Sequence, residues 1–337
     1  MKFTSSRLVA AVVALVALAA SAGPGRSAEK IKITIAAHSA PFAPLYHAQA
    51  SGYFAEEGLD VDIVVAPGPG AVQAVLARDA QFTVAVATYQ IAAYERGQPL
   101  LALMSILTRN SVNVVMHKEV ARAKGVSEKS PLTDKIRALK GLRLSGLTPG
   151  SFTQQVLLYY LLKAGLDPQK DVEMVGLGTA SALLTALEQR RIDAFAIGTP
   201  TPEAAVARGF GLMVVDNAAG EDPDFAEFMM DVLLAPPEIV KQQPALVRKV
   251  VRSLVRSNVW LLDHPAEQAV PFMKPVLGRL DESVILAGLQ KTRLGIPRDG
   301  RITESAVRLT QQFLRQIGAL KRPIPYDELV TNEFLPR

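Results

Sequence analysis

A strand, a loop, a helix and a second strand follow one another between residues 31 and 67, and this βαβ unit restricts the fold more than any other feature. Ile alternates with polar residues over Ile31–Ala37, which indicates a half-buried strand. Pro44–Glu57 has helical spacing, Gly58 is a typical residue at a helix end, and Val61–Val65 indicates the second strand. Ligands of such units lie at the carboxyl ends of strands, so the loop after the first strand is the first candidate site.

The same pattern returns later in the chain, so two related α/β lobes are expected. Leu142–Ser145 indicates a strand, Thr153–Ala164 a helix and Val172–Leu177 the next strand. The other matched landmarks are Gly-Leu-Asp at 58–60 and 165–167, apolar helical turns at Ala71–Ala77 and Ala182–Leu187, buried strands at Phe82–Val86 and Asp193–Ile197, and Arg-Gly at 96–97 and 208–209. Chance likeness between two ordinary βαβ segments is the alternative, and the shared order of several landmarks favours the repeat.

Residues 1–28 are interpreted as a secretion signal and not as part of the fold. A positively charged start precedes an unbroken apolar run over Leu8–Ala20, and Ala20-Ser21-Ala22 fits the small-residue pattern of a cleavage site. The run is shorter than the roughly 20 residues that span a bilayer, with an uncleaved anchor as the alternative. The mature chain is expected to start between Gly23 and Glu29 and to be located in the periplasm.

The absence of cysteine excludes disulfides, thiol nucleophiles and thiolate metal sites. The 37 basic and 32 acidic residues are spread along the chain without a long run of Lys and Arg, so nucleic acid is not expected as a partner. A length of 337 residues fits about two domains. No cofactor and no metal site is predicted.

The predicted ligand-binding residues lie in loops that follow strands or precede helices in both lobes. They supply hydroxyls, rings and glycine backbone, and they are Ser39, Ala40, Phe42, Gly70, Thr88, Tyr89, Thr108, Gly150, Ser151, Phe152, Thr179 and Thr199. Plain turns, helix caps and core packing are the alternatives for these residues. Ser151 occupies the N-cap position of a helix, where its hydroxyl can cap the helix or contact a ligand. Ligand contact is preferred, so Ser151→Ala is expected to lower affinity about tenfold with little loss of stability.

Several short motifs resemble those of one family. They are Gly52-Tyr53-Phe54, Glu57-Gly58-Leu59-Asp60-Val61, Leu139-Lys140-Gly141, Ala164-Gly165-Leu166-Asp167 and Ile192-Asp193-Ala194. Over nearly all of residues 30–320 the chain resembles the solute-binding proteins of ABC importers for nitrate, sulfonates, taurine and thiamine precursors, the NMT1/THI5-like or SsuA-like family. Gln81 departs from the pattern, because family members usually carry Asp there.

The resemblance implies an α/β fold of the periplasmic-binding-protein type II, with two Rossmann-like lobes, two crossing strands and a ligand cleft between the lobes. The expected parts are the signal at 1–28, the first lobe at 29–112, the second lobe at 113–230, and a return segment with C-terminal helices of the first lobe at 231–337. It also implies a small organic or anionic solute, lobe closure around that solute, an ABC permease in the inner membrane as partner, and a monomer.

An enzyme on the same fold is the main alternative. The resemblance extends to enzymes of pyrimidine synthesis and desulfination that use Cys together with His, and this chain has no cysteine. His38 lies in a cleft loop, but no carboxylate neighbours it in sequence to form an acid–base pair. A binding protein without catalytic residues is therefore predicted. A ligand-sensing subunit of a signalling system would have the same cleft and stays open, and the sequence does not identify the ligand or its charge.

Overall fold

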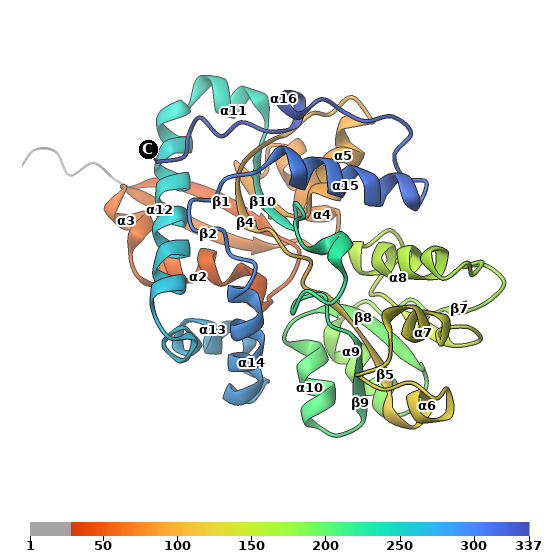
Figure 1. The fold of residues 1–337 in the computed structure, drawn as a ribbon. Helices are drawn as coiled ribbons and strands as arrows, with labels where there is room; N and C mark the ends of the chain where they lie inside the picture. The colour runs from red at the N-terminus through yellow and green to blue at the C-terminus, as the bar shows by residue number, and fades with distance from the viewer. Residues whose placement is uncertain (1–27, 337) are drawn as a thin grey trace, which may run out of the picture.

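Two five-stranded sheets, one in each of two lobes, form the framework of the computed structural model, which describes residues 28–336 (Figure 1). The secretion signal predicted for residues 1–28 falls, except for its last residue, outside the described residues. Within residues 28–336, no helix combines the length and apolar character needed to cross a membrane.

The first sheet has the strand order β2-β1-β3-β10-β4. Its strands are β1 (Glu29–Ile35), β2 (Leu59–Val65), β3 (Phe82–Ala85), β4 (Leu101–Leu107) and β10 (Asp231–Ala235). β1 runs parallel to β2 and β3, whereas β10 runs antiparallel to β3 and β4. Ile31, Ile33 and Ile35 are all buried, which confirms the face predicted from their alternation.

The helices of the first lobe come from both ends of the chain, and several of them pack directly on the first sheet (Figure 1). These helices are η1 (Ala40–Phe42), α2 (Ala43–Ala50), α3 (Tyr53–Glu56), α4 (Gly70–Leu76), α5 (Ala87–Tyr94), α11 (Pro237–Gln242), α12 (Pro244–Asp263), η3 (Ala266–Ala269), α13 (Val270–Leu277), α14 (Glu282–Arg293), α15 (Glu304–Gln316) and α16 (Tyr326–Leu329). The single helix predicted over Pro44–Glu57 is wrong, because Gly52 has a left-handed backbone (φ 74°) and separates α2 from α3. Long α12 packs on both of these short helices.

The second sheet has the strand order β7-β6-β8-β5-β9. Its strands are β5 (Val112–His117), β6 (Arg143–Ser145), β7 (Glu173–Met174), β8 (Ala194–Gly198) and β9 (Gly211–Val215). The helices of this part of the chain are α6 (Lys118–Ala123), α7 (Leu132–Arg137), α8 (Phe152–Lys163), α9 (Ala180–Glu188), α10 (Thr201–Ala207) and η2 (Pro223–Phe225). A strand was predicted over Val172–Leu177, but only the two residues of β7 form a strand there.

The two sheets share one topology, as the repeated sequence pattern predicts. In each sheet the first strand of the repeat lies between the second and the third, and an antiparallel strand follows beside the third. That antiparallel strand is β10 in the first sheet and β5 in the second, and each stands next to a point where the chain passes between the lobes. The passages lie between Leu107 and Val112 and before Asp231, so two crossing segments join the lobes.

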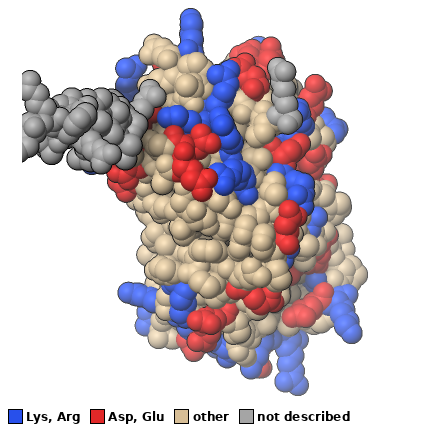
Figure 2. Space-filling model, turned by 90° about the vertical axis from the view of Figure 1, so that its left-hand side faces the viewer, with Lys and Arg blue, Asp and Glu red and all other residues tan. Residues whose placement is uncertain are grey.

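One face of the molecule, the left-hand side of Figure 1, carries its charges at both ends of the two-lobed body. Figure 2 shows basic and acidic side chains interspersed at the top and bottom of this face, with a broad uncharged band between them. On the α12 side of the first lobe, Arg256 pairs with Glu56 at 2.6 Å and Arg252 with Glu57 at 3.4 Å. Such exposed pairs contribute at most about 1 kcal/mol each.

Candidate functional site

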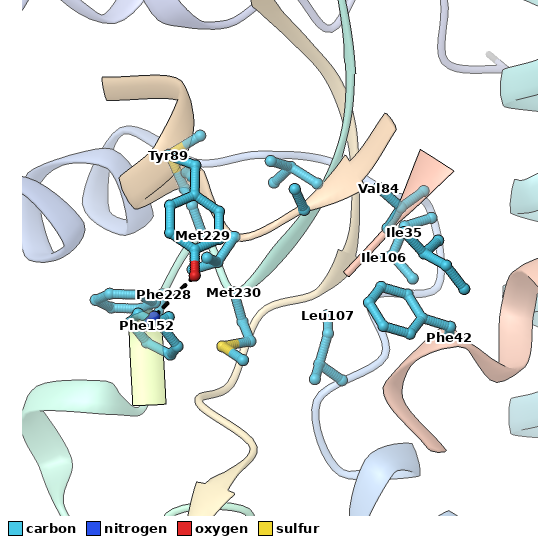
Figure 3. Close-up of a cluster of buried hydrophobic side chains, with 14 of the residues drawn as sticks. Ile35, Phe42, Val84, Tyr89, Ile106, Leu107, Phe152, Phe228, Met229 and Met230 are labelled. Atoms are coloured by element: carbon cyan, nitrogen blue, oxygen red, sulfur yellow. Dashed lines mark hydrogen bonds between the residues drawn. The ribbon is translucent and has the colours of Figure 1, made fainter. Parts of the chain in front are cut away.

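The candidate site lies where the lobes meet, next to the carboxyl ends of β1 and β3 (Figure 3). The backbone N–H of Phe152, at the start of α8, donates to the hydroxyl of Tyr89 in α5 over 2.8 Å. The backbone N–H of Ala40 donates to the carbonyl of Thr199 at 3.4 Å. Both bonds join the first lobe to the second, and all four residues are buried. The structure therefore holds the lobes in a closed arrangement at these loops.

Tyr89 owes its place to the short passage from β3 into α5. The strand ends at Ala85, Val86 keeps an extended backbone, and α5 starts at Ala87, so Tyr89 lies in the first helical turn. Burial raises the pKa of Tyr89 to about 12, the Phe152 N–H opposes this shift, and the nearby charge of Asp231 adds to it. The phenol is therefore neutral at physiological pH.

Apolar side chains surround this hydrogen bond. The ring of Phe152 lies 5.8 Å from those of both Phe228 and Phe313. Figure 3 shows Met229 and Met230 beside Tyr89, and Phe42 in the same cluster toward the end of β1. Phe42 and both methionines are buried. Aromatic and thioether groups adapt well to the flat face of a bound solute.

The loop after β8 meets α14 of the first lobe in a second contact. Thr199 is fully buried, and its hydroxyl lies 3.5 Å from that of Thr292. A Cβ at Gly288 would lie only 2.6 Å from the Cβ of Pro200 and 3.5 Å from that of Ala40. Only glycine therefore lets α14 approach the two loops this closely.

An ion-pair cluster lies beside this contact and joins the same elements. Lys291 of α14 places its Nζ 3.0 Å from the carboxylate of Glu203 in α10 and 2.7 Å from that of Asp216, which follows β9. Burial raises the pKa of Glu203, and the charge of Lys291 opposes that shift. The cluster thus ties the C-terminal part of the first lobe to the second lobe through groups that are mostly shielded from water.

Ser151 serves as a helix cap. Its hydroxyl donates to the carbonyl of Gly146 over 2.7 Å and accepts from the backbone N–H of Gln154 over 3.3 Å. The capping alternative left open by the sequence is therefore confirmed. Because the hydroxyl hydrogen is already used, the expected tenfold affinity loss for Ser151→Ala has no support in this geometry.

The remaining predicted residues lie around the junction with less burial. Gly150 and Thr179 are exposed, and the Thr179 hydroxyl caps α9. Thr108 donates its hydroxyl to a backbone carbonyl that follows α14, at 3.0 Å. Gly70, the first residue of α4, and Ser39, just before η1, are partly buried. Ligand contacts of these residues stay a prediction.

Sequence reasoning missed Asp231, although the residue begins the return strand β10. Its side chain is 4% exposed, and Oδ2 has no hydrogen-bond partner within residues 28–336. Burial raises the pKa of this carboxyl to about 7. Thr88, 1% exposed, has a buried hydroxyl oxygen that is likewise unpaired among the described residues. An acidic residue opening the apolar segment Asp-Val-Leu-Leu-Ala was the signal available in the sequence.

His38 is the histidine considered for the enzyme alternative. Its ring lies next to the phenol of Tyr46. Its exposed ring places Nδ1 2.5 Å from the hydroxyl of Tyr46. Burial raises the pKa of Tyr46 far above its usual value, so this phenol is neutral. A neutral phenol orients an imidazole, but it is not the carboxylate partner of an acid–base pair.

Open hollows elsewhere on the surface do not coincide with this site. One of about 600 Å³ is lined by residues such as Gln154, Leu162 and Met174, and another of about 410 Å³ by residues such as Lys30 and Asp79. None of the twelve predicted residues lines either hollow.

Comparison with known proteins gives a family model and several curated relatives. The model described as NMT1/THI5 like matches residues 39–268. YtlA of Bacillus subtilis (strain 168), whose name gives a binding protein without a stated ligand, is 24% identical over 318 residues, or 90% of this chain and 88% of YtlA. Riboflavin-binding protein RibY of Chloroflexus aurantiacus is 25% identical over 347 residues, or 95% of this chain and 91% of RibY. A 4-amino-5-hydroxymethyl-2-methylpyrimidine phosphate synthase of Aspergillus parasiticus is 24% identical over 275 residues, or 75% of this chain and 73% of the synthase.

Solved structures share the fold over most of the chain. A protein of Bordetella bronchiseptica RB50 matches with a TM-score of 0.76 and 25% identity, over 92% of this chain and 96% of that one. The periplasmic aliphatic sulphonate binding protein SsuA of Escherichia coli matches with a TM-score of 0.67 and 18% identity, over 88% of this chain and 95% of SsuA. The likeness to SsuA is one of fold alone.

Proposed function

Because the chain belongs to the NMT1/THI5-like family, we propose that it is the solute-binding component of an ABC-type importer. It captures a small organic or anionic solute, of the sulfonate, nitrate, taurine or thiamine-precursor class, between its lobes. It then delivers this solute to a permease in the inner membrane. The observation that carries the proposal is the buried junction at which polar groups of both lobes meet, Phe152 with Tyr89 and Ala40 with Thr199.

Lobe closure is the proposed mechanism of capture. A solute that contacts both lobes at once favours the closed state by its difference in affinity for the two states. The crossing segments are suited to act as the hinge, because β4 and β10 lie side by side in the first sheet and both lead to the second lobe. The ion pairs of Lys291 with Glu203 and Asp216 add to the stability of the closed state.

The names of the relatives support solute binding and differ in the solute. RibY is named for riboflavin and SsuA for aliphatic sulphonates, whereas YtlA is named for no ligand. No ligand is therefore transferred from a relative to this chain. An enzymatic role is not proposed: a relative is named as a synthase, but His38 lacks a carboxylate partner among the described residues.

The proposed location is the periplasm, and the proposed state is a monomer. The positively charged start, the short apolar run and the small-residue step before residue 23 support export with cleavage. N-terminal sequencing of the exported protein should find a first residue between Gly23 and Glu29. Recovery of Met1 on membrane-bound protein would contradict this location.

Native mass spectrometry and small-angle scattering test the function together. Protein purified without unfolding should retain a small solute, which should be recovered chemically unchanged after prolonged incubation. Removing the solute should increase the radius of gyration, and restoring it should reverse the increase. A protein that retains nothing, or whose radius does not respond to a bound solute, would contradict capture by lobe closure. Conversion of the solute would favour an enzyme instead.

A further inference from the structure

Asp231 stands at the junction of the lobes, at the point where the chain returns to the first sheet. It is the first residue of β10 and lies opposite Leu107, the last residue of β4. The next residue of β10, Val232, is paired with Ala85 at the end of β3. Asp231 therefore stands level with the passage from β3 into α5, which carries Thr88 and Tyr89.

Oδ2 of Asp231 is paired with no cation and no hydrogen-bond donor among the described residues. Within residues 28–336 its side chain takes part in no ion pair, and Oδ2 is buried without a hydrogen bond. Buried carboxyl groups are normally paired or hydrogen-bonded, and leaving one unpaired is costly. The Asp231 carboxylate lies at the junction of the lobes and has an oxygen without a partner in the described part of the protein. A donor group of the solute can therefore pair with it.

The hydroxyls of Thr88 and Tyr89 add further polar groups to the site around the Asp231 carboxylate. The Thr88 hydroxyl is buried and unpaired among the described residues, so it can accept or donate a hydrogen bond. The Tyr89 hydroxyl accepts from Phe152 and keeps its own hydrogen for a further acceptor. Apolar side chains of Met229, Met230 and Phe152 lie around the Tyr89 hydroxyl (Figure 3).

We propose that Asp231 is the main ligand-recognition residue and that the solute presents to it an N–H group able to carry positive charge. Amines, amidines and amino-substituted heterocycles are the chemical classes that meet this description. The inference rests on the proposed function and narrows its range of solutes. An ammonium or amidinium supplies the buried carboxylate with both the charge and the hydrogen bonds that it lacks.

Anions fit this position poorly. A sulfonate or nitrate placed against Asp231 would bring like charges together in a water-poor site, where their repulsion is stronger than in water. The carboxyl would have to keep its proton to admit such a solute, and Asp231, Thr88 and Tyr89 would then offer the buried anion only neutral O–H donors and no cation. The Asp231 carboxylate and its neighbouring hydroxyls thus favour the N–H-bearing members of the proposed range.

Isothermal titration with two pairs of compounds of matched shape and opposite charge tests the inference. The pairs are benzamidine with benzoate, and 2-phenylethylamine with 3-phenylpropanoate. The wild-type mature protein should bind the cation of at least one pair about tenfold more tightly than its anion. Asp231→Asn should weaken that cation by about 10- to 100-fold and leave the anion no weaker. Asp62→Asn, at an exposed position on β2, is the matched control and should behave as the wild type.

A second variant guards against a folding defect in Asp231→Asn. Thr88→Val keeps the shape of the side chain and should weaken the same cation several-fold. Equal binding of cation and anion, tighter binding of the anion, or no binding of any of the four compounds would overturn the inference. So would unchanged cation affinity in either variant. In each of these cases, a solute retained in native mass spectrometry would still support the proposed solute-binding function. The failure of the Asp231 inference can thus be told apart from the failure of the proposed function.

Discussion

Replacing Asp231 by Asn should stabilise the solute-free protein above neutral pH and have little effect near pH 4. The carboxyl is buried, its Oδ2 has no hydrogen-bond partner within residues 28–336, and its pKa in the folded protein is about 7, against 3.8 for the ordinary group. The folded state therefore holds a proton that the unfolded state has already released. Folding becomes less favourable as the pH rises from about 4 to about 7, and the full loss remains above that range.

The size of the effect follows from the difference between the two pKa values. About three pKa units at 1.36 kcal/mol each correspond to a loss of about 4 kcal/mol for the wild type above pH 7. The Asn amide and the neutral Asp carboxyl are both buried polar groups, so their burial costs of about 1–3 kcal/mol each nearly cancel. The net gain for Asp231→Asn at pH 8.5 is therefore about 4 kcal/mol, and the gain should fall to near zero at pH 4.

Urea unfolding at pH 4, 5.5, 7 and 8.5 measures this difference. The single tryptophan of the chain, Trp260, supplies the fluorescence signal. It is stacked on His47 at 4.1 Å, and burial lowers the pKa of His47 to about 4, so the signal itself changes at the acidic end. That change is common to both proteins and cancels in their difference. Tyr89, the titratable neighbour whose pKa Asp231 shifts, has a pKa of about 12 and does not titrate in this range.

Two results would refute the reasoning. Equal unfolding free energies of the two proteins at every pH would show that Asp231 is hydrated or paired in the folded state. A gain of the same size at pH 4 and pH 8.5 would show that the variant acts through packing and not through the charge. Asp62→Asn, measured alongside, should show no comparable dependence on pH.

Three further variants test other contacts of the junction. Lys291→Met leaves the buried Glu203 carboxylate without its cation, so the closed arrangement should weaken by about 1–3 kcal/mol. The radius of gyration of the solute-free protein should then rise. Adding Glu203→Gln should reverse most of that rise. Tyr89→Phe removes the acceptor of the Phe152 N–H, so affinity for the retained solute should fall about 2- to 12-fold in isothermal titration. Ser151→Ala removes a helix cap and should lower the unfolding free energy by about 0.5–2 kcal/mol with affinity within about threefold; a tenfold affinity loss at unchanged stability would restore its ligand role.

The fold could be predicted because its signals are local. Alternating Ile in β1, the Gly-Leu-Asp steps after both repeat helices and the apolar stretch of β10 each indicate one element within a few residues. Their repetition in the same order then indicates two lobes of one topology, which the strand orders of the two sheets confirm. Gly52 shows the limit of such patterns, because helical spacing continues across it while its backbone is left-handed.

The site was harder to predict because its decisive contacts join distant parts of the chain. An N-cap position such as that of Ser151 also faces the ligand side of a βαβ unit, so sequence cannot separate the two roles. Gly288 has no special sequence context, and its need for a missing Cβ comes from Pro200 of the other lobe. Asp231 looks like the polar end of an apolar strand, and its sequence neighbours do not indicate that it is buried.

The position of β10 also sets the order in which the two lobes can be completed during synthesis. The strands of the second sheet all lie within residues 112–215, so that sheet has its full set of strands well before the chain ends. The first sheet lacks the strand between β3 and β4 until residue 235 has been made. Until then the facing edges of β3 and β4 have no partner, and exposed edges of this kind are where chains pair wrongly. The lobe that begins first is therefore the one that a growing chain finishes last.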